Sequence, residues 1–429
     1  MKVKIKYFLA CLVTAALFFS GCDLNVSNPN SPTEEDLKTY DGIKLLSIGL
    51  QARLSQTIGD YITVSGAVSG ETTPGIGYLD YQSLRKYTDN TKRTRLDKAN
   101  SYVRLVWVGQ YKVIKTANDI LNNVNNIGMD ESTRRGIISL AELGKVMSFY
   151  TLITHWEKIP LNTNVDFPTF ADRAAVIAEC LNLLNDIDAK VAAGAFSNEF
   201  NKNILGTGFD IANTAKAYRA RFLLMKGDYA AAAAAASAVT AESQFVYAES
   251  NGYNPLYEHF TLMKFTQALD VWVEGAEAGD QRVAATVDLT TKKGYFGSDT
   301  AYAITKYNAP SKPYKMYTLN EMSLIKAEAY ARVGGGDPAA EVNKVRAAAG
   351  LQPYSGSNIL KEIFWQRYYE LYLTAQHWED LRRFKGDGID IVNQQRSDML
   401  SHEWLTYPDS EVDKNPNTPA QPTLINYGL

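Results

Sequence analysis

Apolar residues recur at intervals near 3.6 over much of the chain, which is the spacing of an amphipathic helix. The first such stretch covers residues 36–57, with Ser31 or Thr33 as its candidate N-cap. Its apolar positions are Leu37, Tyr40, Ile43, Leu46 and Leu50. Residues 100–127 and 130–156 predict two longer helices, which pack antiparallel because only a short connection separates them.

Two further helix pairs meet at a Gly-Asp junction. Gly227 is placed to end one helix and Asp228 to cap the next, and Gly336 and Asp337 repeat this arrangement. Small residues follow both junctions, as in tetratricopeptide hairpins. The sequence therefore predicts an all-α fold: a tetratricopeptide-like scaffold of about four helical hairpins with long irregular loop insertions.

Two segments lose the helical period and are predicted to be these insertions. Residues 60–95 contain several glycine or proline breakers and four tyrosines. Residues 245–315 combine scattered glycines and prolines with many aromatic residues. Residues 359–384 then predict one last long helix, followed by a polar tail rich in proline and asparagine.

The amino-terminal residues follow the plan of a secretory signal. Three lysines precede about fourteen mostly apolar residues, fewer than the roughly 20 that a spanning helix needs. Ser20-Gly21 is followed directly by Cys22, which resembles a bacterial lipoprotein signal whose cleavage leaves Cys22 first, to be lipidated. We predict a signal peptide over residues 1–21, a lipidated cysteine and flexible tether over 22–33, and a helical domain over 34–429.

Charge and cysteine content narrow the class of protein. The formal net charge is -3, and removing the three lysines of the signal gives -3 - 3 = -6, so the basic face that nucleic-acid binding needs is not expected. Cys11 leaves with the signal and Cys22 is the lipid site, so Cys180 has no partner for a disulfide. Because its apolar neighbours lie at helical spacing, Cys180 is predicted to be a buried, inert thiol rather than a reactive one.

The motifs of catalysis and metal binding are not found in the sequence. The four histidines are scattered outside any two-histidine helical motif, and no glycine-rich loop ends in Lys-Ser/Thr. Adjacent acids read as solvated helix positions, and no dedicated oxygen-rich calcium loop is visible. We predict no catalytic residue, no metal and no cofactor.

The chain has instead 26 tyrosines and 6 tryptophans. An aromatic face stacks on the apolar face of a sugar ring while neighbouring polar groups bond its hydroxyls. The candidate ligand-binding residues in the insertions are Tyr78, Asp80, Tyr81, Arg85, Tyr87 and Trp272. The alternatives are core packing for the aromatic residues and a surface ion pair for Asp80 and Arg85. The aromatic residues predicted for the core are Trp107, Tyr150, Trp156 and Trp365.

Several stretches together resemble one family, the SusD/RagB outer-membrane lipoproteins of Bacteroidota. They are CDLNVSNPNSPT, WVGQYKVIKTANDIL, Asp280-Gln281-Arg282, NEMSLIKAEAYARVGG, VNKVRAAAGL and YPDSEVDKNPN, and they run from Cys22 nearly to the C-terminus. The most specific are Ala327-Glu328-Ala329, Asn343 and Arg346. Four charged residues near the C-terminus stand at spacings that permit ion pairs. They are Arg367, Glu370, Asp380 and Arg383.

The resemblance implies a binding protein without enzymatic activity. Such a protein is held on the outer membrane by its lipid, facing the exterior. It captures an oligosaccharide, or less often a peptide, and delivers it to a SusC-like TonB-dependent β-barrel transporter. We expect residues 60–95 and 250–300 to form the ligand surface. The alternatives are a membrane-anchored glycoside hydrolase and a surface adhesin.

Overall fold

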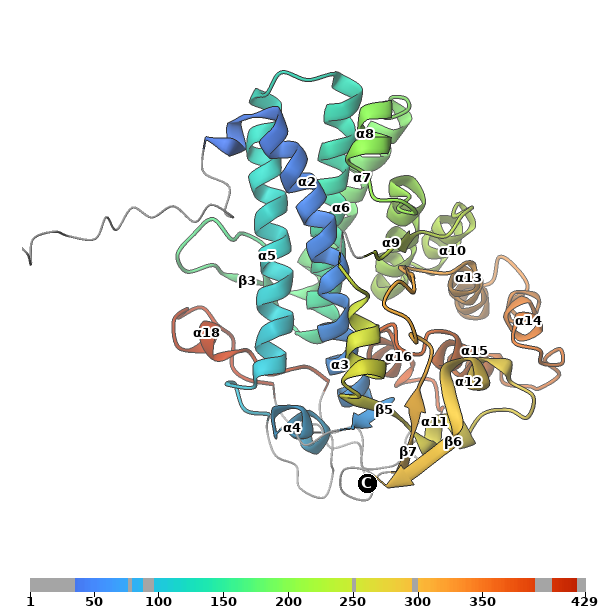
Figure 1. Cartoon of the computed structure of the whole chain (residues 1–429). Helices are drawn as coiled ribbons and strands as arrows, with labels where there is room; N and C mark the ends of the chain where they lie inside the picture. Colours follow the sequence, from blue (N-terminus) through green and yellow to red (C-terminus); the bar gives the residue numbers. More distant parts are fainter. Residues whose placement is uncertain are drawn as a thin grey trace, which may run out of the picture.

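The computed structural model of the protein describes residues 35–75, 79–87, 96–248, 252–294, 300–389 and 403–422. Helices make up most of the structure, and the strands are short (Figure 1). Before residue 240 the helices are η1 (Asp36–Lys38), α2 (Tyr40–Gln56), α3 (Ile58–Ser69), α4 (Leu79–Tyr87), α5 (Ser101–Asn123), η2 (Val124–Asn126), α6 (Glu131–His155), α7 (Arg173–Ala192), α8 (Asn198–Asn203), α9 (Ile211–Lys226) and α10 (Tyr229–Ser237). After it they are η3 (Tyr257–Leu262), α11 (Asp270–Glu274), α12 (Gln281–Thr286), α13 (Leu319–Val333), α14 (Pro338–Ala348), α15 (Ile359–Glu370), α16 (His377–Phe384) and α18 (Asp409–Val412).

The long helices pack one against the next in chain order. Contacts join α2 to α5, α5 to α6, α6 to α7, α7 to α9, α9 to α10, α10 to α13 and α13 to α14. Figure 1 shows this series crossing the molecule from α2 and α5 to α14 at the opposite side. Packing of each unit on its neighbours is the organisation of helical repeat proteins. The predicted all-α, tetratricopeptide-like scaffold is confirmed.

The predicted helix over residues 36–57 is in fact a single turn, η1, followed by α2. The N-cap of α2 is Thr39, whose Oγ1 accepts a hydrogen bond of 3.0 Å from the backbone N–H of Gly42. The two predicted caps, Ser31 and Thr33, lie outside the described residues.

Both Gly-Asp junctions separate helices as predicted, but α13 is capped by Gly334, with a φ of 79°, and not by Gly336. Gly227 ends α9 with a φ of 80°, which a residue without a Cβ adopts readily. Asp337 caps α14 by accepting hydrogen bonds from the backbone N–H groups of Ala339 and Ala340, at 2.9 and 3.2 Å. Asp228 precedes α10, but its side chain makes no capping hydrogen bond there. Of the two predicted aspartate caps, therefore, Asp337 forms capping bonds and Asp228 does not.

The first predicted insertion is more ordered than the sequence suggested. Residues 60–95 were predicted to be irregular, yet α3 occupies most of their first part. Gly70 ends α3 with a φ of 79°, but two other glycines, Gly59 and Gly66, are positions of close packing. A Cβ on Gly59 would lie 2.9 Å from Pro255 Cβ, and one on Gly66 would lie 2.8 Å from Thr72 Oγ1. Glycine is needed at these positions for close approach within a helix and not for a turn.

The second predicted insertion forms part of a small antiparallel sheet, so its prediction as wholly irregular is wrong. The sheet has the strand order β1-β5-β7-β6, in which the first strand comes from the other insertion. These strands are β1 (Thr72–Pro74), β5 (Thr266–Leu269), β7 (Thr300–Ile304) and β6 (Val287–Gly294). Ala268 stands opposite both Thr72 and Tyr302, so it lies in the central strand β5. The sheet therefore joins the two predicted insertions.

Two further pairs of strands are very short. They are β2 (Ile159–Pro160) with β3 (Phe170–Ala171), and β4 (Gln244–Phe245) with β8 (Tyr314–Lys315).

The predicted long helix over residues 359–384 is broken into α15 and α16. Leu373 and Ala375, between them, have φ values of 61° and 63°, in the left-handed region that helices do not use. The break turns α16 back onto α15, so that Arg367 Nε donates a hydrogen bond of 2.8 Å to Asp380 Oδ2. Both side chains are almost fully buried. A buried ion pair thus accompanies the break.

An aromatic cluster ties the C-terminal segment to the first helices. Trp107 packs against Trp156 and Tyr407 with ring centroids 4.9 and 6.2 Å apart. Trp156 Nε1 donates a hydrogen bond of 2.9 Å to the carbonyl oxygen of Thr406. Trp107, Tyr150 and Trp156 are buried as predicted, whereas Trp365 remains partly exposed.

Among the described residues, α6 is the one helix long and apolar enough to span a membrane by length and composition. Of its apolar window, 83% is buried inside the protein, which is typical of a core helix. Cys180, on the neighbouring α7, is also fully buried, and burial raises the pKa of its thiol. The predicted inert cysteine is confirmed.

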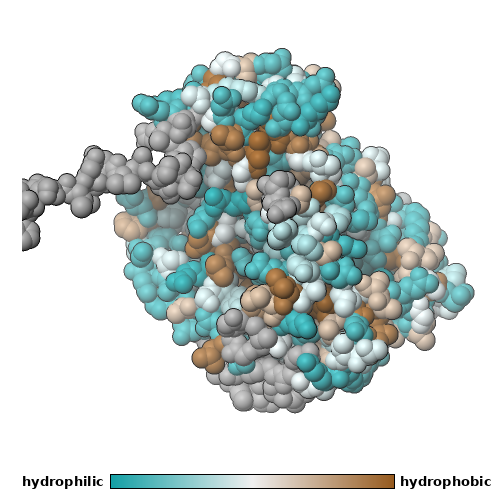
Figure 2. All heavy atoms as spheres, in the orientation of Figure 1, coloured by the Kyte–Doolittle hydropathy of each residue, from teal (hydrophilic) through white to brown (hydrophobic). Residues whose placement is uncertain are grey.

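Figure 2 shows that the exposed apolar side chains of one face form small patches separated by polar ones.

Candidate functional site

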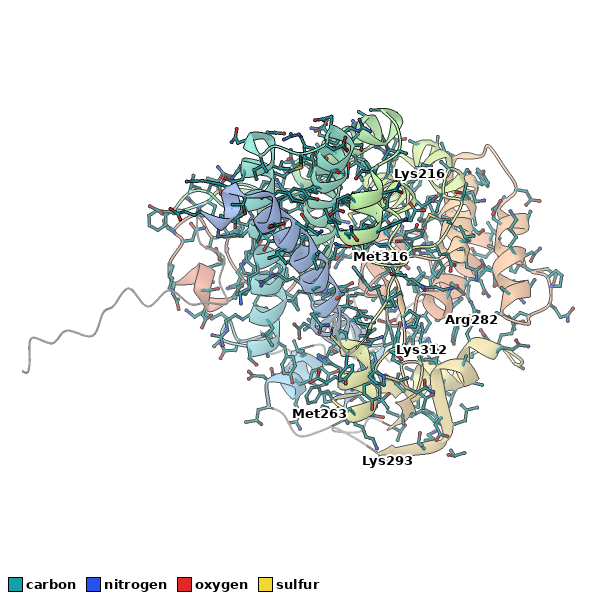
Figure 3. The ribbon with its side chains drawn as sticks, turned by 45° about the horizontal axis from the view of Figure 1, so that its top comes forward. Lys216, Met263, Arg282, Lys293, Lys312 and Met316 are labelled. Atoms are coloured by element: carbon teal, nitrogen blue, oxygen red, sulfur yellow. The ribbon has the colours of Figure 1, made fainter. Side chains whose placement is uncertain are left out.

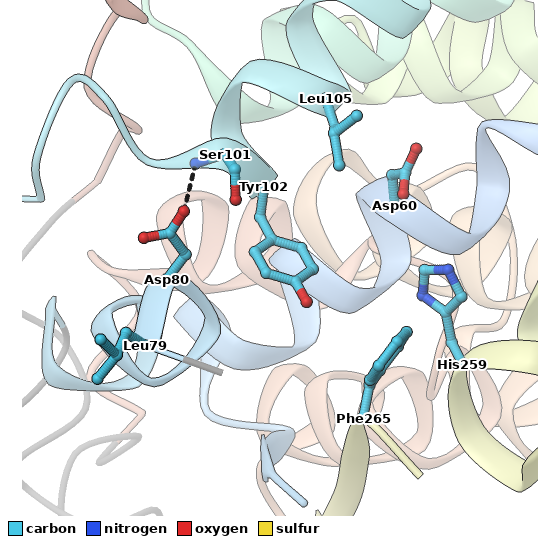
Figure 4. A pocket seen from close by; sticks show the side chains of 8 residues that line it. All are labelled: Asp60, Leu79, Asp80, Ser101, Tyr102, Leu105, His259 and Phe265. Carbon is cyan, nitrogen blue, oxygen red and sulfur yellow. Dashed lines mark hydrogen bonds between the residues drawn. The ribbon is translucent and has the colours of Figure 1, made fainter. Parts of the chain in front are cut away.

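A cleft of about 570 Å³ opens where α3, α4, the first turn of α5 and the η3–β5 segment meet. Its lining residues are Asp60, Leu79, Asp80, Ser101, Tyr102, Leu105, His259 and Phe265. Figure 4 shows the ring of Tyr102 in the middle, with Asp80 on one side and His259 and Phe265 on the other. We call it the Tyr102 cleft. Its volume falls in the range of small-molecule sites.

The start of α5 positions one wall of the cleft. Asn100 is the N-cap, and its Oδ1 accepts hydrogen bonds of 3.1 Å from the backbone N–H groups of Tyr102 and Val103. Asp80 Oδ2 accepts a hydrogen bond of 3.0 Å from the N–H of Ser101 (Figure 4). A carboxylate is stabilised at this positive end of the helix. Asp80 thus fixes the helix start and brings a carboxylate into the cleft.

The opposite wall depends on close packing of η3 against α3. His259 lies near Gly59, where a Cβ would stand 3.1 Å from its Nε2. Its Nδ1 is 2.9 Å from Thr63 Oγ1, within hydrogen-bond distance. The ring of Phe265 stands edge-on to the imidazole, with the centroids 5.4 Å apart. These contacts hold His259 and Phe265 at the cleft.

Burial shifts the pKa of two groups in the cleft. Burial, followed by the negative charge of Glu258, raises the pKa of Asp60 to about 6. Burial lowers the pKa of His259 to about 4, so the imidazole is neutral at neutral pH. At that pH Asp60 is mostly ionised, and it can accept hydrogen bonds. Among the described residues, no group of three or more histidine, cysteine or acidic side chains is placed to hold a metal ion.

The remaining lining is apolar and partly open to solvent. The side chains of Leu79 and Leu105 are 78% and 50% exposed at the rim. Tyr102 and Phe265 are partly buried and add two aromatic rings. Aromatic and aliphatic faces beside carboxylates suit a ligand that carries both apolar faces and hydroxyl groups.

Of the six predicted ligand-binding residues, the structure places Asp80 in the cleft. Tyr81 and Trp272 are fully buried, which corrects the expectation that they belong to exposed loops. Trp272 stacks on Tyr372 with the ring centroids 3.8 Å apart, and Tyr81 hydroxyl hydrogen-bonds Thr266 Oγ1. Their rings fill the core around the small sheet and have no face open to a ligand.

The other three predicted residues are not described at the level of side chains. Tyr78 lies outside the described residues, as does the predicted lipid site, Cys22. Arg85 and Tyr87 belong to α4, whose last side chains are likewise outside what the structure describes.

Of the eight lining residues, sequence reasoning named only Asp80, and three of the others, Ser101, Tyr102 and Leu105, lie outside both predicted ligand segments. A signal for two of them existed. Tyr102 and Leu105 are large and apolar, yet they fall off the broad apolar face of the helix at residues 100–127. Large apolar side chains on the polar face of an amphipathic helix are candidates for an exposed binding surface.

The comparisons with known proteins agree with this fold. The sequence model of the SusD family matches residues 292–423. The structure of B. fragilis NanU superimposes with a TM-score of 0.71 and 15% identity, over 93% of this chain and 100% of that one. A SusD superfamily protein from Parabacteroides distasonis gives 0.69 and 17%, over 90% and 99%. Residues 292–423 are therefore similar in sequence to the SusD family, and nearly the whole chain shares the fold of SusD-like proteins.

A third SusD-like structure is of surface glycan-binding protein A from Bacteroides thetaiotaomicron in complex with laminarihexaose. It matches with a TM-score of 0.67 and 15% identity, over 90% of this chain and 99% of that one. Identities this low establish the shared fold alone. No curated protein matches the chain in sequence. The segment matched by the SusD family begins after every residue that lines the Tyr102 cleft.

The segment that the SusD family matches contains a buried network of charges instead. Glu328, fully buried in α13, accepts hydrogen bonds from Arg332 and from Arg383, the latter at 2.8 and 2.9 Å. Arg383 also donates to Asp380, which pairs with Arg367. The predicted ion pairs among these residues form in part, because Glu370 lies instead 3.7 Å from Arg282. The residues that indicated the family therefore stabilise the helices rather than line the cleft.

Proposed function

We propose that the protein is a nutrient-binding protein that captures an oligosaccharide at the cell surface. The observation that carries the proposal is the match of nearly the whole fold to SusD-like proteins, one of them solved with a bound glycan. Another neighbour of the same fold is named as a laminarin-binding SusD-like protein. The proposal is binding without catalysis, and it is supported by the neighbours of the same fold that are named as glycan-binding proteins.

The proposed ligand site is the Tyr102 cleft. It combines residues of the first predicted insertion and residues 259–265 of the second with the start of α5, which lies outside both. Tyr102 and Phe265 would contact the apolar faces of sugar rings, and the carboxylates of Asp60 and Asp80 would accept hydrogen bonds from sugar hydroxyls. The exposed leucines at the rim would add apolar contact for a longer chain.

The proposal has two further parts. The protein delivers its ligand to a SusC-like TonB-dependent transporter, and it is attached to the outer membrane through Cys22. The sequence pattern around Cys22 supports the anchor. Two or more acyl chains give stable membrane attachment and raise the concentration of the protein beside its partner. Extraction in detergent should recover a large β-barrel protein with this chain. Recovery of the chain without such a partner would favour an adhesin.

We expect alanine at Tyr102 and at Phe265 to weaken oligosaccharide binding. Loss of both rings removes their stacking contacts, and we expect the dissociation constant for laminarihexaose to rise about tenfold or more. Isothermal titration calorimetry measures this directly. Tyr253→Ala is the matched control, because Tyr253 is 54% exposed and does not line the cleft.

Two results would count against this site or this function. Unchanged affinity in the double variant, for a glycan that the parent binds, would move the ligand elsewhere on the protein. Failure of the parent to bind any of a panel of neutral and acidic oligosaccharides would contradict the proposed function itself. Release of reducing ends from a polysaccharide by the purified protein would favour the hydrolase alternative.

A further inference from the structure

A second pocket, of about 410 Å³, lies between α9, α12, residues 306–318 and the end of α15. None of the residues that line the Tyr102 cleft lines it. Figure 3 shows three of its residues, Arg282, Lys312 and Met316, near one another in the C-terminal half of the molecule. We call it the basic pocket. Among the described residues its charged lining is Arg221, Arg282, Lys306, Lys312, Lys315, Glu321 and Glu370.

Three of the five basic side chains are neutralised by carboxylates. Each has an acidic partner within 2.8 Å. The pairs are Arg221 with Glu321, Arg282 with Asp280, and Lys315 with Glu242.

Lys306 and Lys312 have no such partner. No carboxylate of the described residues lies within 4.0 Å of either ammonium. Lys306 is only partly exposed, and its Nζ donates a hydrogen bond of 3.2 Å to the carbonyl oxygen of Tyr372. Burial lowers its pKa, and the more distant charges of Glu370 and Glu71 offset part of that shift. An ammonium withdrawn from water without a carboxylate in direct contact is destabilising. A ligand with a negative charge would provide the contacting counter-ion that the two lysines lack among the described residues.

The backbone around both lysines is fixed. The N–H groups of Thr305 and Lys306 both donate to the carbonyl oxygen of Thr286, at 2.8 and 3.1 Å. The carbonyl oxygen of Lys312 accepts a hydrogen bond of 2.6 Å from Nδ2 of the fully buried Asn254. Lys306 and the exposed Lys312 thus extend from anchored backbone, which lowers the ordering cost of binding.

The pocket also offers apolar contact. Tyr307, Pro313 and Met316 line it beside the lysines. A ring with an apolar face and a negative group fits both features. The pocket volume suits a few sugar units and excludes a folded protein.

We propose that the basic pocket binds the carboxylate of an acidic sugar, a uronic acid within an oligosaccharide. Lys306 and Lys312 contact the carboxylate, and the apolar wall contacts the sugar ring. This inference rests on the proposed function for the choice of a sugar, and it adds the chemical class of one ligand group. The two sites are separate, so each can be removed without the other.

The test compares trigalacturonate with its methyl ester, which has the same skeleton without the negative charges. Calorimetry should show binding of the acid and at least roughly tenfold weaker binding of the ester. The double variant Lys306→Gln, Lys312→Gln should weaken binding of the acid by a similar factor. Added sodium chloride should also weaken it, because salt screens partly exposed charges.

Lys216→Gln is the matched control, since Lys216 lies on α9 but does not line the pocket (Figure 3). Thermal unfolding of both variants checks that the fold is kept. Three results would each overturn the proposal: equal binding of acid and ester, no binding of the acid by the parent, or a double variant whose affinity for the acid is unchanged. Competition by inorganic sulfate as strong as by the acid would reject a sugar-specific site. Laminarihexaose binding tests the Tyr102 cleft separately, and the lysine variants should leave it unchanged.

Discussion

Replacing Glu328 by alanine is expected to lower the free energy of unfolding by about 3–5 kcal/mol. Glu328 is fully buried and accepts from two arginines, Arg332 at 3.0 Å and Arg383 at 2.8 Å. Each arginine keeps another acidic partner, Asp387 and Asp380 respectively. Without Glu328, however, the total positive charge of the buried network exceeds its negative charge, and the guanidinium groups lose hydrogen bonds. Urea denaturation followed by circular dichroism measures the loss.

An exposed ion pair provides the matched control for this prediction. Glu131 pairs with Arg134 at 3.1 Å, but the glutamate side chain is 67% exposed. Glu131→Ala should change stability by less than about 0.5 kcal/mol, because water already solvates the carboxylate and Arg134 keeps its hydrogen bonds to the carbonyl oxygens of Val124 and Ile127. If Glu328→Ala were as mild as Glu131→Ala, the buried network would not stabilise the packing of α13 on the C-terminal helices.

The helical part of this fold could be predicted because its signals are local. A 3.6-residue period depends only on neighbouring residues, and it located α2, α5 and α6 within a few positions. The junctions after α9 and α13 were visible for the same reason, since a residue without a Cβ marks a helix end, although Gly334 rather than Gly336 caps α13. Local signals also separated the tetratricopeptide-like hairpins from the long segments between them.

The elements that were missed depend on distant partners. Gly59 and Gly66 resemble loop residues in sequence, and only their packing against Pro255 and Thr72 explains why α3 contains them. The break between α15 and α16 contains no glycine or proline, so nothing local indicates the left-handed backbone at Leu373. Strand β5 pairs with strands before and after it in the sequence, and such pairings have no local pattern.

The candidate site was predicted by region more successfully than by residue. The two insertions do meet, and Asp80 lies where they do. Tyr81 and Trp272 were chosen because their segments were read as loops, but the same meeting of the insertions buries them beneath the small sheet. Their neighbours Tyr102 and Phe265 remain partly exposed. Which aromatic residue of an insertion is covered depends on tertiary packing, which composition alone does not contain.

The second large effect concerns Glu71, at the start of strand β1. Its side chain is fully buried, Oε2 accepts a hydrogen bond of 3.3 Å from Ser69, and Oε1 has no partner among the described residues. Burial raises the pKa of this carboxyl from 4.5 to about 8. Between those two pH values the folded state keeps a proton that the unfolded state releases. Stability contributed by Glu71 is therefore present below about pH 4.5 and is lost as the pH rises to about 8.

Glu71→Gln should remove this dependence, because a glutamine does not ionise. We expect the variant to be more stable than the parent by roughly 3–5 kcal/mol above about pH 8, with a difference that shrinks by up to about 1.4 kcal/mol per unit as the pH falls toward 4.5. Urea denaturation at a series of pH values measures the difference. Glu157→Gln, at an exposed position, should run parallel to the parent throughout. If the difference between Glu71→Gln and the parent stayed constant with pH, Glu71 would be ionised in the folded protein. Water or a cation would then have to reach a carboxyl that is enclosed by α3 and the sheet.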